Sequence, residues 1–328
     1  MNNVYFSQDL DTKFLNNLKD QLKSNFKDCK KIAIKIHFGD DVKNRTALFP
    51  EQIEPITNLL KELNISFFLF DSSVAYPDSL RDNPITHKQL AIERGWNTIG
   101  EIRTDDSKFI TVKGDLDYQL CKELVDADGV LVISHFKGHY HCTGIAGAIK
   151  NIGMGAFTKK TKGEIHDGGK PIYTSGCVQC KLCEKSCPFE GIEVKDKPIF
   201  KKCFGCSNCI YVCPNKCIKT KVNYFDYLLS EAAFLAQSNF KKFYYINIAR
   251  NITKACDCDS NSGPIIAKDV GYFSSNDAVA IDKACYDSIV KTEGYDPFLK
   301  NGKKPGIKHI EFAEKLGLGK KEYKFVDI

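Results

Sequence analysis

Several features that would define other protein classes are missing from this sequence. Its apolar stretches are short, and one of the longest, residues 65–70, is far below the ~20 residues of a membrane-spanning helix. The opening MNNVYFSQDLDTKF has no basic segment followed by an apolar one, so no secretory signal is visible. The net charge is +6, but the basic residues are spread along the chain without an aromatic-rich basic tract. We therefore expect a cytoplasmic protein that binds neither membranes nor nucleic acid.

Cysteine, in contrast, is abundant. The chain holds 15 cysteines among 328 residues, and its 43% apolar and 27% charged residues are typical of a globular protein. Its length allows one large domain or two ordinary ones. Fifteen cysteines could form a disulfide framework, but such frameworks belong mostly to short secreted chains. The length, the missing signal and the repeated CxxC spacing favour metal ligation instead.

Eight of these cysteines form two matched runs of the pattern CxxCxxCxxxCP, offset by 26 residues. This pattern is typical of bacterial-type ferredoxins with two [4Fe-4S] clusters, in which the fourth cysteine of each run binds the other run's cluster. One predicted ligand set is Cys177, Cys180, Cys183 and Cys213, and the other is Cys203, Cys206, Cys209 and Cys187. A zinc site is the alternative, but it usually needs four ligands in two separated pairs and fits eight cysteines poorly. Cys217 lies outside both sets, where the repeat has Gly191, and we interpret it as a packing residue.

The sequence on both sides of these runs alternates between short apolar segments and amphipathic ones. Strands are predicted at 31–37, 65–70, 129–134, 243–248 and 323–326. Helices are predicted at 53–63, 84–95, 120–127, 226–237 and 276–290, with a further one after Ile307. Such alternation predicts an α/β fold with a mainly parallel sheet covered by helices on both faces.

The domain organisation follows from these segments. We expect one α/β domain made of residues 1–170 and 223–328, interrupted by a small ferredoxin-like α+β insertion at residues 171–222. Neither flank alone looks long enough for a well-formed parallel sheet. Two independent flanking domains are the alternative.

Histidines gather where predicted strands end. Three of the seven histidines lie in SHFKGHYHC directly after the strand at 129–134, and His37 and Asp71 end two other strands. Ligands of α/β sheets bind beyond the carboxyl ends of the strands, so these groups could share one cleft. The candidate catalytic residues are His135, Lys137, His139 and His141, the histidines as ligands or proton donors and the lysine as an anion contact. Hydrogen-bonded loop caps are the alternative for any single histidine.

A glycine-rich segment, residues 144–155, follows the histidines. Its backbone could approach a ligand closely, and with a lysine it could hold a phosphate at a helix N-terminus. Close packing explains the glycines equally well, and no GxGxxG directly follows a strand. The candidate cofactor-binding residues are His37, Gly144, Gly147, Lys150 and Asn151. The basic run at 159–162 is predicted to be a solvated loop.

Two features stand near the other end of the chain. The CxC pair Cys256 and Cys258 could chelate a metal, act as a redox pair, or be two buried structural cysteines. Asp277 precedes a predicted helix and could cap it.

Together these stretches resemble one family, domain of unknown function 362 (DUF362), with an inserted ferredoxin domain. The resemblance rests on the cysteine runs and on IKIHFGD at 34–40, SHFKGH at 134–139, GAIKNIGMG at 147–155, CDC at 256–258 and DVGYFSSNDAVAIDKA at 269–284. One departure is CTGIAG at 142–147, where the family more often has GFGGA. The resemblance implies a fold and cluster ligands but no particular reaction.

These observations favour an iron–sulfur oxidoreductase that relays single electrons through two [4Fe-4S] clusters to a site in the α/β domain. A flavin or an additional metal could complete that site, although no motif demands either. We expect a redox partner protein, such as a ferredoxin, a flavodoxin or a reductase, and a small anionic substrate. The alternatives are an electron-transfer subunit that docks a partner enzyme, and a metal-handling or cofactor-assembly protein.

Overall fold

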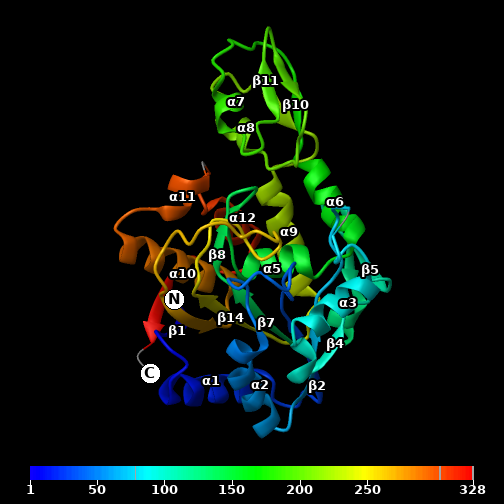
Figure 1. Cartoon of the computed structure of the whole chain (residues 1–328), viewed down its shortest axis with the longest axis vertical. Coiled ribbons are helices and arrows are strands. Elements are labelled where there is room, and N and C mark those ends of the chain that lie inside the picture. Colours follow the sequence, from blue (N-terminus) through cyan, green and yellow to red (C-terminus); the bar gives the residue numbers. More distant parts are fainter. Residues whose placement is uncertain (78, 303, 327–328) are drawn as a thin grey trace.

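An eight-stranded sheet forms the centre of the computed structural model, which describes residues 1–77, 79–302 and 304–326 (Figure 1). In spatial order the strands are β16 (Tyr323–Val326), β1 (Asn2–Ser7), β15 (Gly271–Ser275), β14 (Phe243–Ala249), β7 (Val130–His135), β2 (Lys31–Lys35), β3 (Ser66–Phe70) and β4 (Glu101–Arg103). The strands from β14 to β4 are parallel, and β15 is antiparallel to both of its neighbours. The predicted α/β fold with a mainly parallel sheet is therefore confirmed.

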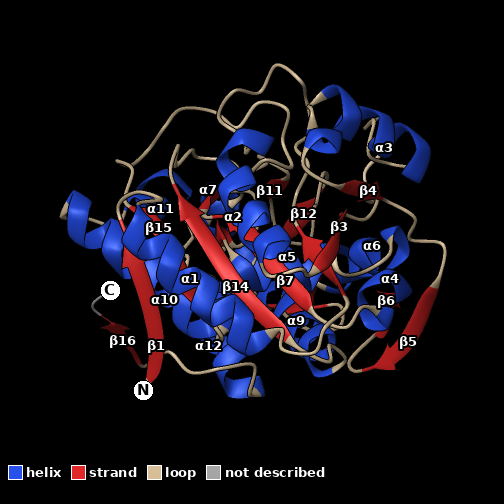
Figure 2. Ribbon diagram, turned by 90° about the horizontal axis from the view of Figure 1, so that it is seen from below, coloured by secondary structure: helices blue, strands red, loops and turns tan. Residues whose placement is uncertain are grey.

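Both faces of the sheet are buried, which explains why its central strands read as nearly continuous apolar runs. In β7, Val130 and Val132 join the hydrophobic core on one face, and Leu131 and Ile133 join the core on the other. The helices α1 (Thr12–Asn25) and α2 (Pro50–Glu62) cover one face. The helices α5 (Ala148–Gly155), α9 (Phe225–Ser238), α10 (Ala278–Glu293) and α12 (Lys308–Leu316) cover the other (Figure 2).

Local sequence signals set several of the helix boundaries. Helices α2 and α3 (Pro84–Glu93) begin at a proline, whose fixed φ suits the first helical turn. The Asp277 side chain accepts hydrogen bonds from the amides of Val279 and Ala280, so its predicted role as the cap of α10 is confirmed. A 3-10 turn (Trp96–Thr98) follows α3, and α11 (Pro297–Gly302) precedes α12.

The helix predicted at 120–127 is wrong in its first part. Leu120 and Cys121 end the strand β6 (Asp117–Cys121), which pairs with β5 (Phe109–Lys113) in a hairpin. Only the following residues form a helix, α4 (Lys122–Asp126). Strand pairing with a neighbouring segment therefore overrides a local pattern that suits either conformation.

The cysteine-rich module projects from one end of the molecule, at the top of Figure 1. Its elements are β10 (Pro171–Tyr173), α7 (Leu182–Ser186), β11 (Ile192–Val194), β12 (Pro198–Phe200), α8 (Asn208–Tyr211) and β13 (Ile218–Thr220). β10 pairs with β13, and β11 pairs with β12. The module follows helix α6 (Lys159–Gly168) and leads into α9. None of the helices in the described ranges has the length and apolar composition needed to cross a membrane.

The two halves of the module repeat each other in backbone conformation as well as in sequence. Lys181 and Ser207, one repeat apart, both have positive φ (57° and 61°). Glu190 and Lys216 are a second such pair, with φ of 51° each. Residues other than glycine adopt this conformation rarely, so its recurrence at the repeat spacing shows that both runs fold around the same local geometry.

Candidate functional site

A cavity of about 670 Å³ lies at the carboxyl edge of the parallel strands. Three residues of the module, Phe189, Cys203 and Phe204, line it together with residues of the α/β part. Of the predicted site residues, the cavity is lined by His37, His139, His141, Lys150 and Asn151. Its lining does not include His135, Lys137, Gly144 or Gly147. The expected convergence of strand ends on one cleft is therefore present for part of the predicted set.

Lys35, the last residue of β2, links three elements at the floor of the cavity. Its Nζ lies 2.9 Å from Asp71 Oδ1, just after β3, and 2.9 Å from Asn151 Oδ1 on α5. The Asn151 amide also donates to the carbonyl of Ile133 in β7. Burial alone would raise the pKa of Asp71, but the ammonium of Lys35 holds it well below its usual range. The carboxylate therefore stays ionised and orders this end of the sheet.

A buried arginine, Arg81, occupies one wall. Its Nε lies 2.7 Å from Asp40 Oδ1, and its Nη1 lies 2.8 Å from His37 Nε2. It also donates to the hydroxyl of Tyr76 and to the carbonyl of Cys258. Burial, and then the neighbouring guanidinium, hold the pKa of His37 well below its usual range. His37 is therefore neutral in this wall, and its Nε2 accepts from Arg81 because a guanidinium only donates.

The basic run at 159–162 forms the first turn of α6 instead of the predicted solvated loop. Lys162 is only 6% exposed and lines the cavity. Its Nζ donates to the carbonyls of Ser72 and Ser73, at 3.0 and 2.6 Å. Burial lowers its pKa to about 8. Lys160 is solvated as predicted, but the prediction is wrong for Lys162, because its side chain reaches the carbonyls that follow β3.

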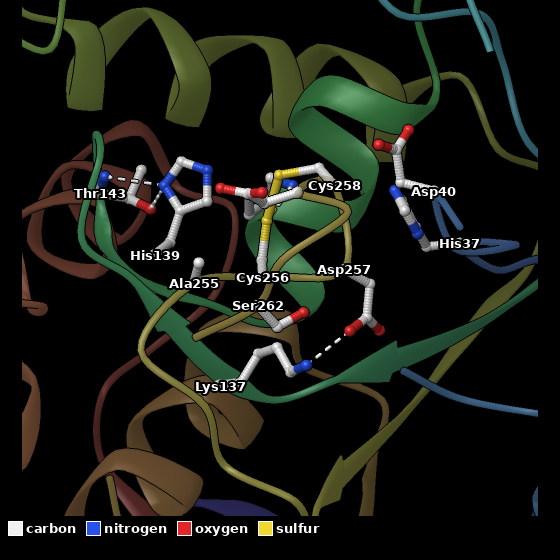
Figure 3. The surroundings of a disulfide bond; sticks show 12 residues. His37, Asp40, Lys137, His139, Thr143, Ala255, Cys256, Asp257, Cys258 and Ser262 are labelled. Atoms are coloured by element: carbon white, nitrogen blue, oxygen red, sulfur yellow. Dashed lines mark hydrogen bonds and ion pairs between the residues drawn. A yellow bond between two sulfur atoms is a disulfide. The ribbon is translucent and has the colours of Figure 1, made fainter. Parts of the chain in front are cut away.

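His135 and Lys137 bind a carboxylate that lies between the two cysteines of the CxC pair. His135 Nδ1 lies 2.8 Å from Asp257 Oδ2, and Lys137 Nζ lies 2.5 Å from Asp257 Oδ1. All three side chains are buried, and Figure 3 shows the contact of Lys137 with Asp257. Burial would raise the pKa of Asp257, but His135 and Lys137 hold it well below its usual range. The structure therefore places His135 and Lys137 as positioning residues for the CxC loop.

His139 and His141 both line the cavity, one deep in it and one beside the module. His139 ends β8 (Lys137–His139), which pairs with β9 (Gly144–Ala146). The Nδ1 atom of His139 contacts Thr143 through the amide nitrogen (3.2 Å) and the hydroxyl oxygen (3.1 Å). The ring of His141 stacks on Phe189 with centroids 5.3 Å apart. His141 therefore joins the cavity to the cysteine-rich module.

The glycine-rich segment serves packing, and the idea of a phosphate at its helix N-terminus is wrong. The buried carboxylate of Asp282 already accepts from the first amides of α5, those of Ala148 and Ile149, at 2.7 and 3.0 Å. A Cβ at Gly147 would lie 2.3 Å from that carboxylate. Gly144 has φ of +81° and borders the backbone at Gly306. Gly144 and Gly147 are therefore needed because neighbouring atoms lie too close for a side chain at either position.

Cys256 and Cys258 are joined by a disulfide at the cavity. Lys150 reaches the same place from α5, with its Nζ 3.5 Å from Cys256 Sγ. Burial, and then the positive charge of Arg81, lower the pKa of Lys150 to about 8. Figure 3 shows the CxC loop turned toward His139. The CxC pair therefore belongs to the cavity, a connection that its sequence position did not reveal.

Two small cavities in the module each gather four cysteines of the two matched runs. The first is lined by Cys177, Cys180, Cys183 and Cys213, and the second by Cys187, Cys203, Cys206 and Cys209. Backbone amides face sulfurs at matching positions: the Gln179 amide lies 3.4 Å from Cys177 Sγ, and the Gly205 amide lies 3.4 Å from Cys203 Sγ. Cys217 also lines the first cavity, 3.4 Å from Cys213 Sγ.

Several residues of the site were not predicted. A lysine within the apolar run IAIKI was a signal for Lys35, since a buried lysine needs a partner. Arg81 lies in a loop without a recognisable motif, and Asp257 lies inside the CxC pair, where only the cysteines drew notice. Asp40, a partner of Arg81, is 41 residues away, and His135, a partner of Asp257, is 122 residues away. Only the tertiary structure brings these groups together.

Fold and site together define an α/β protein with a cysteine-rich module inserted beside a polar cavity. Comparison with known families then gives the assignment: the chain belongs to the family described as domain of unknown function (DUF362), which matches residues 32–287. The predicted family is thus confirmed over most of the chain.

Two individual proteins are also similar to parts of the chain. A subunit of the ion-translocating oxidoreductase complex of Methanosarcina acetivorans is 37% identical over 62 residues, which is 17% of this chain and 24% of that protein. The lactate racemase apoprotein from Thermoanaerobacterium thermosaccharolyticum aligns with 84% of this chain and 54% of its own, at a TM-score of 0.40 and 12% identity. The chain therefore matches about a quarter and about half of these two proteins.

Proposed function

We propose that this protein is an iron–sulfur oxidoreductase in which two [4Fe-4S] clusters relay single electrons to the large cavity. One observation carries the proposal: Cys203 and its neighbours Phe189 and Phe204 line both the second cysteine cavity and the large cavity. A cluster bound there would border the polar site directly. The similarity to part of an oxidoreductase complex agrees with a redox role.

The module's residues suit the clusters. Each small cavity contains one predicted set of four cysteines, the ligand number of a cubane, and each set draws three from one run and one from the other. The amides of Gln179, Gly205 and Gly191 face cysteine sulfurs, as hydrogen bonds that stabilise reduced clusters do. When bound, such clusters supply one-electron transfer.

The arrangement implies a direction of transfer. Among the described residues, the lining of the first cysteine cavity shares none with the large cavity, whereas the lining of the second shares Phe189, Cys203 and Phe204. Val178 and Leu182 are exposed beside the first cysteine cavity, at 60% and 43%. A one-electron carrier protein would dock at this apolar surface, and the second set would pass the electron toward the large cavity.

Within the cavity, Lys150 is suited to hold a small anionic substrate. Lys35 and Arg81 are already paired with Asp71 and Asp40. Lys150 has no such ion pair among the residues that the structure describes, and it lines the cavity. Its positive charge is therefore available to an anion.

The proposal is tested with anaerobically purified protein. We expect about eight iron and eight sulfide ions per chain, and bleaching of the cluster absorbance by a reduced viologen. Viologen-coupled reduction is then screened over small carboxylates and phosphates, and Lys150→Met should lower any turnover by about tenfold, the value of a charge-assisted hydrogen bond. Lys160→Met is the matched control, because Lys160 is 56% exposed and lies on the neighbouring surface of α6.

Two results would contradict the proposed oxidoreductase. Zinc in place of iron would contradict the relay. Bleachable clusters with no turnover on any anion, or turnover that Lys150→Met leaves unchanged, would favour the electron-transfer subunit. The cytoplasmic location belongs to the same proposal, since the relay needs a pool of reduced carriers.

A further inference from the structure

Three potential metal ligands converge on one wall of the large cavity. A ring nitrogen of His139 and the sulfurs of Cys256 and Cys258 all lie within 4.8 Å of one another. They come from two segments more than a hundred residues apart in sequence. His139 and Cys256 are buried, and His139 and Cys258 line the cavity.

We infer that the reduced Cys256 and Cys258, together with the imidazole of His139, bind one divalent transition-metal ion such as Zn²⁺ or Fe²⁺. Thiolate and imidazole are the donors that these ions prefer. Three protein ligands beside an open cavity leave one coordination position for a substrate or water, the arrangement of catalytic rather than structural sites.

The histidine is already turned for this role. Thr143 contacts only the Nδ1 atom of His139, through its amide and its hydroxyl. The Thr143 hydroxyl is itself fixed, because it donates to the carbonyl of Ile145 at 2.5 Å. Figure 3 shows the other ring nitrogen of His139 facing the two sulfurs. Metal-bound histidines typically donate an N–H from their other ring nitrogen to an outer group. The Thr143 hydroxyl oxygen can accept that proton from Nδ1, because its own hydrogen is donated to Ile145.

The CxC loop is held equally firmly. Asp257, between the two cysteines, points to the opposite side and is bound by His135 and Lys137. This anchor leaves both sulfurs on the His139 side of the loop (Figure 3). A disulfide between residues two apart closes too short a loop to constrain the unfolded chain much, so a stabilising role accounts poorly for the pair.

The disulfide and the metal site are two states of the same pair. Two electrons and two protons break the S–S bond and give two thiols. A divalent ion then displaces those two protons and forms two metal–thiolate bonds. Lys150, 3.5 Å from Cys256 Sγ, offsets part of the negative charge of the thiolates. The inference rests on the proposed function only for the source of the two electrons in the cell, which the clusters would deliver one at a time.

Metal content after chemical reduction tests the inference. The cluster-loaded protein is reduced anaerobically with a phosphine, incubated with Zn²⁺, desalted, and its zinc and iron are measured. Wild type should retain about one zinc per chain. Cys256→Ser, Cys258→Ser and His139→Gln should retain almost none, with iron unchanged. Thr143→Val, which removes the hydroxyl that orients His139, should weaken zinc binding about 10–100-fold.

Cys142→Ser is the matched control, because Cys142 is a buried thiol that lines the same cavity outside this group. It should bind zinc as wild type does. Wild type without zinc after full reduction, or equal zinc in wild type and the three ligand variants, would overturn the metal site. The phosphine reduces the disulfide without help from the clusters. Zinc binding in a protein whose clusters are inactive would therefore refute the proposed electron relay and leave the metal site standing.

Discussion

Lys35 Nζ and Asp71 Oδ1 are 2.9 Å apart, and the side chains are only 1% and 4% exposed. This ion pair joins the carboxyl ends of β2 and β3 under the cavity. Removing one partner of a buried pair leaves a charge with no compensation, whereas removing both does not.

Lys35→Met should therefore lower the free energy of unfolding by about 3–5 kcal/mol. The double variant Lys35→Met/Asp71→Leu should lose less than Lys35→Met alone. Denaturant unfolding followed by far-UV circular dichroism measures both in a double-mutant cycle. If the loss of unfolding free energy in the double variant equalled the sum of the two single losses, the two charges would not stabilise each other.

Lys162 should make stability depend on alkaline pH. Burial lowers its pKa from 10.5 to about 8, so between these values the unfolded chain binds more protons than the folded protein. Stability contributed through Lys162 should therefore rise as the pH increases from about 8 to about 10. The measurement is the difference in unfolding free energy between wild type and Lys162→Met across this range. In Lys160→Met, which alters an exposed residue of the same helix, the difference from wild type should stay flat.

Cys187→Ser should damage the cluster of the second cysteine run rather than that of its own run. Cys187 lines the second small cavity with Cys203, Cys206 and Cys209. After reduction, the electron paramagnetic resonance spectrum of Cys187→Ser should match that of Cys203→Ser. A spectrum that matched Cys180→Ser instead would refute the crossed ligand sets. Cys217→Ser is the control and should keep both clusters, since Cys217 is expected to pack beside the first cluster without binding it.

Gly147→Ala should destabilise the protein by about 1–3 kcal/mol, the usual effect of overpacking. A Cβ there would lie 2.3 Å from Asp282 Oδ1 and 2.8 Å from the Phe136 ring. Gly163→Ala provides the contrast, because a Cβ in the middle of α6 would meet only Ala75, at 3.9 Å. That substitution should stabilise the protein by up to about 1 kcal/mol through helix propensity. Thermal unfolding compares the two, and equal effects would argue against close packing at the start of α5.

The central parallel strands were predictable because burial on both faces makes each of them an apolar run. The hairpin of β5 and β6 was missed for the opposite reason: β5 alternates between exposed and half-buried residues and has no such run. Strands β1 and β15, toward the antiparallel side of the sheet, and β4, at the parallel edge, were missed as well, whereas the edge strand β16 was predicted. Sequence periodicity thus predicts the central parallel strands of the sheet better than the strands around them.

For the site, strand-end position correctly brought His37, His139 and His141 to one cavity. It could not separate them from His135 and Lys137, because the partner of those two, Asp257, lies in a distant loop. A residue's place along the chain shows which strand end it occupies but not which way its side chain turns. That direction depends on pairing across the fold.

The pairing of β10 with β13 places Pro171 opposite Thr220, so the module begins and ends at adjacent points. A segment whose two ends adjoin can be gained, lost or exchanged without rerouting the chain that surrounds it. The eight-stranded sheet is built entirely from strands outside the module, which joins the rest of the chain between α6 and α9. The sheet pairing of the flanking segments therefore does not depend on the length or content of the module between them.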